Sequence, residues 1–325
     1  MSDVSHRVIV AAAAETVRAL IADTSRWPVI FRPTIHVEQV ERVEQVEHVE
    51  WSAGTERIRI WAAAGDEVKS WTSRREHSAD GRRITFEQEV SQAPIAAMSG
   101  AWVLRELPDG RTEVVLEHSY RAVDDDPAAL AWIADVTDRN SRTELANLKE
   151  LAETADERDG LELTFEDTVL VQGDAQRAYD FLHRVADWPA RLPHVSRMQL
   201  AEPEPNVQVM TMDTVAPNGS THTTKSVRVC FPGDRIVYKQ VVVPVLMKAH
   251  TGEWRVRQTP DGVAVTSQHT VVIQPNAIES VLGEGATVAD ALAFARNALS
   301  TNSGITLSLA KKFAEEQQQP ALAGA

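Results

Sequence analysis

The chain has 325 residues, of which 43% are hydrophobic and 25% charged, as is typical of a soluble globular protein of about two domains. Its 47 acidic residues outnumber its 33 basic residues, and the net charge of −14 argues against a nucleic-acid partner. No apolar run approaches the roughly 20 residues of a membrane span, and the start of the chain lacks the features of a secretory signal. The single cysteine, Cys230, excludes an internal disulfide and a cysteine-rich metal site. We therefore expect a cytoplasmic protein without membrane contact, metal or cofactor.

The predicted elements begin with a strand at about residues 5–11 and a helix at about residues 14–22, whose apolar positions recur at a period near 3.6. The stretch SRWPVIFRP, residues 25–33, follows, and its prolines are expected to end that helix because proline lacks an amide donor. About six strands come next, separated by turn signals such as AAAGDE, SADGR and LPDGR. A long helix at about residues 127–153, with leucines along one side, ends this part of the chain.

One segment has no amphipathic pattern, the triplets HVEQVERVEQVEHVE from His36 to Glu50. Each triplet would turn about 300° on a helix, so the valines form no stripe there, and on a strand they alternate between the two faces. We expect two long, exposed hairpin arms whose glutamates discourage edge pairing. A ribbon that binds a partner is the alternative.

The whole order of elements occurs twice. Trp27-Pro28 has a counterpart 161 residues later in Trp188-Pro189, GRRITFEQ is echoed by GDRIVYKQ at an offset of 152, and NSRTELANLKELAE by NSGITLSLAKKFAEE at 162. Loop insertions explain the changing offset, because surface loops tolerate them. We expect an N-terminal domain at residues 1–155, a linker at 156–162, a second copy at 163–318 and a disordered tail at 319–325. The fold class is α+β, with each copy a curved antiparallel sheet wrapped around its long C-terminal helix.

Strand alternation then nominates the residues that face the long helix and line a cavity. In the first copy they are Trp71, Ser73, Arg75, Phe86, Gln88, Met98, Trp102, His118 and Tyr120, with Thr72 and Arg74 as the alternative parity in one strand. In the second copy they are Tyr238, Gln240, His250, Trp254 and His269. Each copy thus places a histidine on the same face as an indole and an amide, which favours a pocket in each.

Structural interpretations stay open for several of these residues. Trp102 and Trp254 are the kind of aromatic residue that fills a core, and Trp27 and Trp188 suit packing at a corner. His118 by itself fits a hydrogen-bonded core histidine. Arg75 on an inward face needs a partner and suggests an anionic or carbonyl-bearing ligand, unless the parity is reversed and it faces solvent. The residues alone indicate two cavity-bearing domains for a largely apolar ligand with several polar groups.

The whole chain resembles the di-domain aromatase/cyclases of bacterial type II polyketide synthesis, members of the START-like helix-grip superfamily. The resemblance is carried by the run Trp71-Thr72-Ser73-Arg74-Arg75 with a following strand that ends in Gln88, by RWPVIF, by NSRTELANLKEL and by the tandem arrangement. It implies action on a poly-β-ketone held by an acyl carrier protein, with first-ring closure between carbons seven and twelve of a ketoreduced chain, dehydration and aromatisation. It also implies other synthase components, a ketoreductase and a ketosynthase, as partners.

The sequence departs from the family pattern at two places. Thr34 stands where some relatives carry a tyrosine, so a phenolic acid is missing there. In the second copy Ser226 and Arg228 replace Ser73 and Arg75, whereas His222 and Thr224 stand where an indole is expected. The two pockets therefore differ, and either they divide ring closure from dehydration or one of them is degenerate.

The resemblance suggests a role for each candidate. Arg75, and Arg228 in the second copy, would stabilise enolate charge, Ser73 and Ser226 would hydrogen-bond a ketone, and His118 and His269 would relay protons. The remaining residues would shape the substrate cavities. For docking of an acidic carrier protein the candidates are Arg74, Arg82, Arg83 and Lys248, although a solvated face explains such charges as well. The alternative function is a non-catalytic carrier of an apolar lipid, isoprenoid or polyketide. A co-chaperone or other partner-binding module would need a conspicuous exposed apolar patch, which the charged triplets do not supply.

Overall fold

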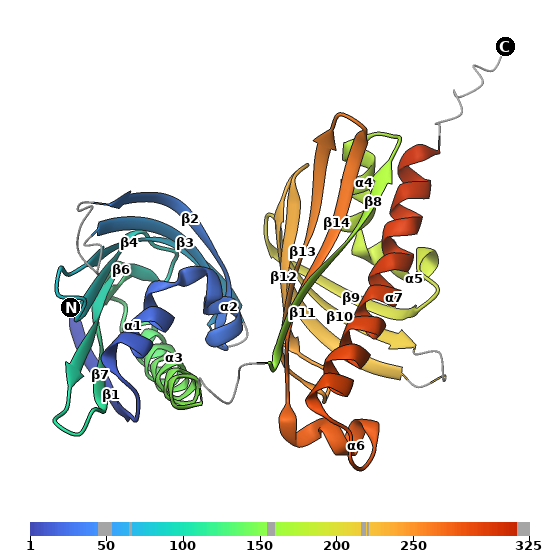
Figure 1. Ribbon diagram of the computed structural model, residues 1–325. Helices are drawn as coiled ribbons and strands as arrows, with labels where there is room; N and C mark the ends of the chain where they lie inside the picture. Colours follow the sequence, from blue (N-terminus) through green and yellow to red (C-terminus); the bar gives the residue numbers. More distant parts are fainter. Residues whose placement is uncertain (45–53, 65–66, 155–159, 216–218, 220, 317–325) are drawn as a thin grey trace. The chain divides into compact units, whose positions relative to one another are not determined.

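The computed structural model describes residues 1–44, 54–64, 67–154, 160–215, 219 and 221–316. The chain divides into two compact units, Met1–Arg158 and Asp159–Ala325, called domain 1 and domain 2 below (Figure 1). Most of the linker expected at 156–162 and the whole of the tail expected at 319–325 lie outside the described residues. Among the described residues, no helix combines the length and the apolar character needed to cross a membrane.

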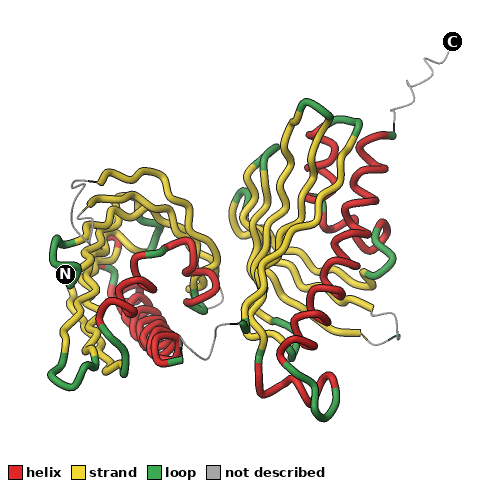
Figure 2. Tube along the Cα trace, in the orientation of Figure 1, coloured by secondary structure: helices red, strands yellow, loops and turns green. Residues whose placement is uncertain are grey.

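Domain 1 is an antiparallel sheet that curves around one long helix (Figures 1 and 2). Its elements are β1 (Ser2–Val10), α1 (Ala14–Ala22), α2 (Trp27–Ile30), β2 (Thr34–Glu44), β3 (Gly54–Ala64), β4 (Glu67–His77), β5 (Arg83–Val90), β6 (Ile95–Glu106), β7 (Thr112–Ala122) and α3 (Pro127–Glu153). The strand order is β1-β7-β6-β5-β4-β3-β2, so each strand from β2 to β7 pairs with its neighbour in sequence and β1 closes the far edge. This confirms the predicted architecture and the predicted bounds of the long helix.

Domain 2 repeats that architecture with the strand order β8-β14-β13-β12-β11-β10-β9. Its elements are β8 (Glu162–Val171), α4 (Ala175–His183), α5 (Trp188–Arg191), β9 (Val195–Glu204), β10 (Val207–Val215), β11 (Thr221–Phe231), β12 (Arg235–Val242), β13 (Met247–Thr259), β14 (Gly262–Ile273), α6 (Ile278–Leu282) and α7 (Val288–Glu315). The predicted duplication is therefore one of tertiary structure as well as of sequence.

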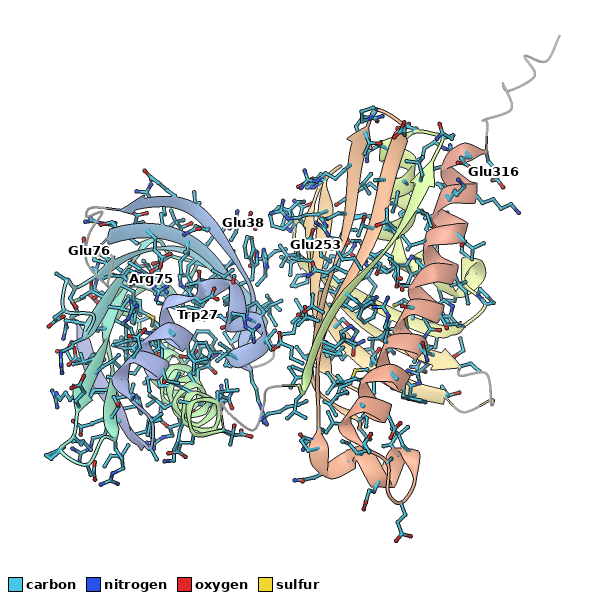
Figure 3. All side chains as sticks on the ribbon, viewed as in Figure 1. Trp27, Glu38, Arg75, Glu76, Glu253 and Glu316 are labelled. Atoms are coloured by element: carbon cyan, nitrogen blue, oxygen red, sulfur yellow. The ribbon has the colours of Figure 1, made fainter. Side chains whose placement is uncertain are left out.

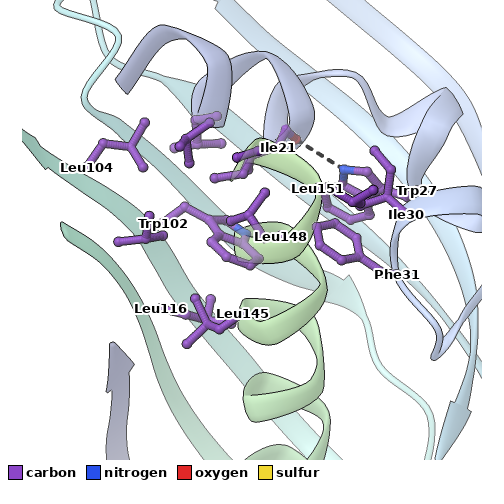
Figure 4. Packing of buried hydrophobic residues seen from close by; sticks show 14 of the residues in the cluster. Ile21, Trp27, Ile30, Phe31, Trp102, Leu104, Leu116, Leu145, Leu148 and Leu151 are labelled. Carbon is purple, nitrogen blue, oxygen red and sulfur yellow. Dashed lines mark hydrogen bonds between the residues drawn. The ribbon is translucent and has the colours of Figure 1, made fainter. Parts of the chain in front are cut away.

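Each long helix begins at a specific side-chain cap. Asp126 accepts a hydrogen bond from the backbone N–H of Ala129 at the start of α3, where Pro127 occupies the first turn. Thr287 and Asp290 form a reciprocal capping box at the start of α7. One face of α3 then presents Leu145, Leu148 and Leu151 to the sheet (Figure 4). The apolar spacing of these residues is what allows the sheet to enclose the helix.

We expected the tryptophan–proline pairs to end the first helix of each domain, and this prediction is wrong. α1 ends at Ala22, a single 3-10 turn follows, and Pro28 lies in the first turn of the new helix α2. Proline is tolerated there because the first amides of a helix have no intrahelical acceptor. Trp27 packs in the core, and its indole N–H donates to the carbonyl of Ile21 at 3.2 Å (Figure 4). Trp188 makes the equivalent bond to Phe181 in domain 2, also at 3.2 Å.

The first part of the triplet segment forms β2, which pairs antiparallel with β3. The inner positions at its start are buried, including Ile35 and Val37, whereas Val40 is exposed. The rest of the predicted hairpin arms, residues 45–53, lies outside the described residues.

The register of the central strands places one glycine of each domain under an aromatic ring. Gly100 pairs with Phe86 on one side and His118 on the other. Gly252 pairs with Tyr238 and His269 in the same way. A Cβ atom at Gly100 would meet the ring of Phe86 at 2.5 Å and also the carbonyl oxygen of Glu117, so the repeated glycine is required by this close approach.

Candidate functional site

A cavity of about 110 Å³ lies between the sheet of domain 1 and α3. Four of the residues predicted for this domain line it, and they come from four neighbouring strands: Trp71, Gln88, Met98 and His118. Helix α3 supplies the opposite wall, with Trp132, Val136, Asn140, Ser141 and Glu144. The cavity is therefore mainly apolar, with a few polar groups at defined places, as ligand sites generally are.

Arg75 does not line this cavity, contrary to the expectation that it faces a ligand. Its guanidinium is fully buried and donates to Glu56 Oε1 at 2.6 Å and to the carbonyl of Ile21 at 2.8 Å. It also lies over the ring of Trp27, 4.8 Å from the centroid, and Figure 3 labels both residues. The inward parity predicted for Arg75 is correct. Its charge, however, is neutralised by a protein carboxylate and ties β4 to the end of α1.

The other predicted residues of domain 1 also lie outside the cavity lining. Ser73 is buried and donates to the carbonyl of Glu87 at 3.1 Å, and the ring of Trp102 stacks on Phe31 with the centroids 6.0 Å apart. Phe86 packs edge-on against His118, and Tyr120 and Thr34 are buried in the core. For Trp102 the structural interpretation left open above is the one observed. The cavity occupies only one end of the sheet, and strand parity cannot show which part of a face is filled by core side chains.

Sequence reasoning missed Glu144, the carboxylate in the cavity of domain 1. It lies on the apolar face of α3, one turn from Ser141 and Leu148, and it has no hydrogen-bond or ion-pair partner among the described residues. Burial without a compensating charge raises the pKa of Glu144 to about 7. A glutamate on the core-facing side of an otherwise amphipathic helix is the signal that would have identified it.

His118 is the second titratable group of this cavity. Its Nδ1 atom is buried and has no hydrogen-bond partner in the described part of the chain. Burial lowers the pKa of His118 to about 4, with a smaller contribution from nearby His6. Domain 1 thus encloses a neutral imidazole and a carboxyl group that titrates near neutral pH.

Domain 2 has a cavity of about 120 Å³ in the equivalent place, under α7. Every residue predicted for this domain lines it: His222, Thr224, Ser226, Arg228, Tyr238, Gln240, His250, Trp254 and His269. Helix α7 adds Leu299, Asn302, Ser303 and Thr306. His194, at the start of β9, also lines this cavity, and sequence reasoning missed it because the equivalent position of domain 1 is Pro33.

A hydrogen-bonded cluster of aromatic polar side chains occupies one wall of this cavity. His269 Nδ1 lies 3.0 Å from the hydroxyl of Tyr238 and 3.0 Å from Nε2 of His250, and its Nε2 lies 3.0 Å from Oγ of Ser267. Burial lowers the pKa of His269 to about 4 and that of His250 well below its usual range, and it raises the pKa of Tyr238. All three are therefore uncharged at neutral pH.

Several polar atoms of this cavity are buried without a partner among the described residues. They are His194 Nδ1, Thr224 Oγ1, Gln240 Oε1 and His250 Nδ1. An unsatisfied buried polar atom lowers the free energy of unfolding by roughly 1–3 kcal/mol, so four in one cavity destabilise the folded domain considerably. They are the donors and acceptors that a polar ligand would satisfy.

Arg228 occupies the place of Arg75 but faces a neutral partner. It donates to Gln208 Oε1 at 2.7 Å and to the carbonyl of Leu182 at 2.7 Å, and it lies 5.6 Å from the centroid of the Trp188 ring. Gln208 in turn donates to Glu202 at 2.7 Å. Unlike Arg75, Arg228 also reaches the cavity lining, and burial lowers the pKa of its guanidinium.

Two wider hollows of about 610 Å³ open on the surface of domain 1. One lies on the outer side of the sheet and includes Arg74 and Arg83, and the other lies between α1 and the β2–β3 edge. Arg74, Arg82 and Arg83, predicted to dock a carrier protein, are paired with Glu76, Glu106 and Glu117 respectively. The charged side chains that line these hollows are largely paired within the protein, so we assign the candidate sites to the two cavities between the sheets and the long helices. Within the part of the chain that the structure describes, no group of three metal-ligating side chains gathers in one place.

The comparisons with known proteins agree with this architecture. The family model for polyketide cyclase/dehydrase and lipid transport proteins matches residues 1–153, and a second model of the same description matches residues 171–289. The chain is 44% identical over 311 residues to the granaticin polyketide synthase bifunctional cyclase/dehydratase of Streptomyces violaceoruber, covering 95% of this chain and 93% of that protein. It is 45% identical over 315 residues to the actinorhodin polyketide synthase bifunctional cyclase/dehydratase of Streptomyces coelicolor, covering 94% of each.

Solved structures show the same two folds in succession along one chain. The di-domain ARO/CYC BexL from the BE-7585A biosynthetic pathway superimposes with a TM-score of 0.85 at 48% identity, covering 98% of this chain and all of that one. The di-domain ARO/CYC StfQ from the steffimycin biosynthetic pathway superimposes with a TM-score of 0.82 at 38% identity, covering 96% of this chain and 98% of that one. With a cavity between sheet and long helix in each domain and this similarity along nearly its whole length, the chain belongs to the polyketide cyclase/dehydrase family, among its di-domain aromatase/cyclases.

Proposed function

We propose that this protein closes the first ring of a ketoreduced poly-β-ketone between carbons seven and twelve and then aromatises that ring by loss of water. The substrate would remain attached to an acyl carrier protein throughout. The observation that carries the proposal is the pair of cavities under the long helices, each with apolar walls and buried polar atoms that lack a partner among the described residues. A chain of alternating methylene and carbonyl groups presents both kinds of surface.

The chemistry needs few protein groups. A methylene between two carbonyls is already acidic, so the protein must hold the chain folded, accept one proton and polarise a carbonyl. In domain 1, Glu144 is suited to proton transfer because its pKa lies near neutral pH. The buried hydroxyl of Thr224 and the guanidinium of Arg228 in domain 2 are suited to hold ketone oxygens.

The size of the cavities limits how much substrate each one encloses. At about 110 and 120 Å³ they are smaller than the roughly 300–1,000 Å³ of typical ligand pockets. We infer that a cavity encloses the ring-forming segment while the rest of the chain extends toward the carrier protein. The relatives described as bifunctional cyclase/dehydratases support a reaction of two steps, ring closure and water loss. Because these relatives are named as parts of polyketide synthases, they also support partnership with other synthase components, and we propose a ketosynthase and a ketoreductase among them.

Reconstitution tests this function. A minimal polyketide synthase and a ketoreductase are combined with the wild-type protein, and the products are identified by mass spectrometry. We expect one first-ring aromatic product in place of the mixture that forms by spontaneous cyclisation. If the mixture is the same with and without the protein, the cyclase function is wrong. Tight equilibrium binding of a finished apolar ligand would then favour the carrier function, which the lipid-transport part of the family description also covers.

A further inference from the structure

Domain 2 contains a set of proton-transfer groups that domain 1 lacks. We propose that the cavity of domain 2 is the place where water is removed from the closed ring, with His250 as the base, Tyr238 as the acid and His269 as the relay between them. This inference rests on the proposed function, because it assigns one of its two steps to one domain.

The equivalent positions of domain 1 show the contrast. The strand register aligns Tyr238 with Phe86, since each faces a glycine across a strand pair. The same register aligns His250 with Met98 and Ser267 with Leu116. Only the central histidine is shared, as His118 and His269. Three polar side chains therefore surround the imidazole of domain 2, whereas the same positions of domain 1 hold the apolar side chains of Phe86, Met98 and Leu116.

The hydrogen bonds define which atom of His250 is free to act as the base. We assign the Nε2 proton of His269 to its bond with Ser267, which leaves Nδ1 as the acceptor from both Tyr238 and His250. His250 then donates from Nε2 and carries its lone pair on Nδ1. That atom is buried and has no partner among the described residues, and His250 lines the cavity. Burial keeps the imidazole neutral, so the lone pair is available at neutral pH.

Tyr238 supplies the acid at the other end of the cluster. Its hydroxyl contacts His269 Nδ1 at 3.0 Å, its ring is held over Gly252, and it lines the same cavity as His250. Burial raises its pKa, so it remains a phenol at neutral pH and has a proton to donate. Acid and base thus lie on either side of one shared imidazole.

The elimination balances without an outside reagent. His250 Nδ1 takes the proton from the carbon beside the ring ketone, and the electron pair of that C–H bond forms the new C=C bond as the C–O bond breaks. Tyr238 donates its proton to the leaving hydroxyl, which departs as water. His269 Nδ1 first accepts the Nε2 proton of His250 and then passes that proton to the phenolate oxygen. His250 ends in its other tautomer and is reset when its Nδ1 proton exchanges with water.

The test follows both steps in the full-length protein. Tyr238→Phe and His250→Asn are each introduced, and single-turnover time courses are recorded in the reconstituted synthase by mass spectrometry. We expect ring closure to continue while water loss slows roughly 100-fold, the usual scale for general acid–base catalysis, so that a closed-ring product heavier by one water accumulates. In His269→Asn the amide oxygen replaces Nδ1 as a hydrogen-bond acceptor, but an amide cannot relay a proton. This variant should therefore give the same shift in product ratio.

Tyr179→Phe is the matched control. Tyr179 is also a buried tyrosine of domain 2 whose hydroxyl has no partner among the described residues, but it packs in the core and does not line the cavity. This variant should keep the wild-type product ratio. The inference is overturned if Tyr238→Phe and His250→Asn form the aromatic product at the wild-type rate, or if they abolish ring closure itself while their thermal unfolding is unchanged. A wild-type protein with no effect on ring formation would instead disprove the proposed function.

Discussion

The two domains share a fold and differ in the side chains that surround one histidine, which both domains contain at the same position. His118 in domain 1 is surrounded by Phe86 and Met98 and shares its cavity with the carboxyl of Glu144. His269 in domain 2 is bonded to Tyr238, His250 and Ser267, and the helix position of Glu144 is taken by Thr306. Duplication of a domain thus kept the scaffold and changed the proton donors and acceptors. The two domains share their strand register but not the chemistry of their cavities. These two properties of the fold can therefore change independently.

The largest expected effect concerns the two buried arginines. Arg75→Ala removes the guanidinium that pairs with the buried carboxylate of Glu56 at 2.6 Å, so we expect a loss of about 3–5 kcal/mol in the free energy of unfolding, measured by urea denaturation of the full chain. Arg228→Ala removes a cation from a neutral amide, so the loss should be smaller, about 1–3 kcal/mol.

A double variant checks the reason for that difference. Arg75→Met combined with Glu56→Leu removes both charges and should recover most of the stability that Arg75→Ala loses. Equal losses for Arg75→Ala and Arg228→Ala would contradict the idea that the carboxylate partner distinguishes domain 1.

The next largest effect on stability concerns Gly100 and Gly252, which occupy equivalent positions in the two domains. An added methyl carbon at Gly100 would meet the backbone carbonyl oxygen of Glu117. At Gly252 it would meet that of Gln268 at the longer distance of 2.6 Å, and the closest atoms there belong to the Tyr238 side chain. Gly100→Ala should therefore lower the free energy of unfolding by roughly 1–3 kcal/mol, and Gly252→Ala by less, because its clash with the backbone is milder and its closest contact is a side chain that can move. Thermal unfolding of the two variants ranks them, and the reverse order would show that the Tyr238 cluster is the more rigid.

The carboxyl of Glu144 makes the stability of domain 1 depend on pH. Its pKa is raised to about 7 in the folded protein, so between its ordinary pKa near 4.5 and pH 7 the folded state binds more protons than the unfolded state, and stability falls as the pH rises. Glu144→Gln removes this effect. We expect the variant to be more stable than the wild type by roughly 1–2 kcal/mol at pH 8 and no more stable at pH 4, in urea titrations at both values. A constant difference at the two pH values would contradict the shifted pKa.

The smallest effect on stability concerns the polar atoms that line the cavity of domain 2 and have no partner among the described residues. Thr224→Val removes a buried hydroxyl that has no partner among the described residues, so we expect a gain of about 1 kcal/mol in the free energy of unfolding. Thr266→Val is the control, since that buried hydroxyl bonds to Thr168 at 2.8 Å and its removal should cost about 1 kcal/mol. If both variants lose stability, the hydroxyl of Thr224 is not held ready for a ligand.

Sequence reasoning predicted the second cavity better than the first. All nine residues named for domain 2 line its cavity, whereas in domain 1 only Trp71, Gln88, Met98 and His118 do so. The physical reason is the size of the apolar side chains. In domain 1 Trp102 stacks on Phe31, whose counterpart in domain 2 is the smaller Leu192, and this packing fills part of the face that strand alternation had assigned to a ligand.

By itself the sequence determined the strands, the long helices, their duplication and the inward face of each strand, because these follow from hydrophobic periodicity, turn residues and local offsets. Only the tertiary structure decided what each inward side chain contacts. Arg75 meets a carboxylate brought from β3, and Glu144 meets no partner at all among the described residues. Tyr238, His250 and His269 come together from three adjacent strands. Contacts of this kind depend on register across the sheet, which joins residues that lie far apart in the chain.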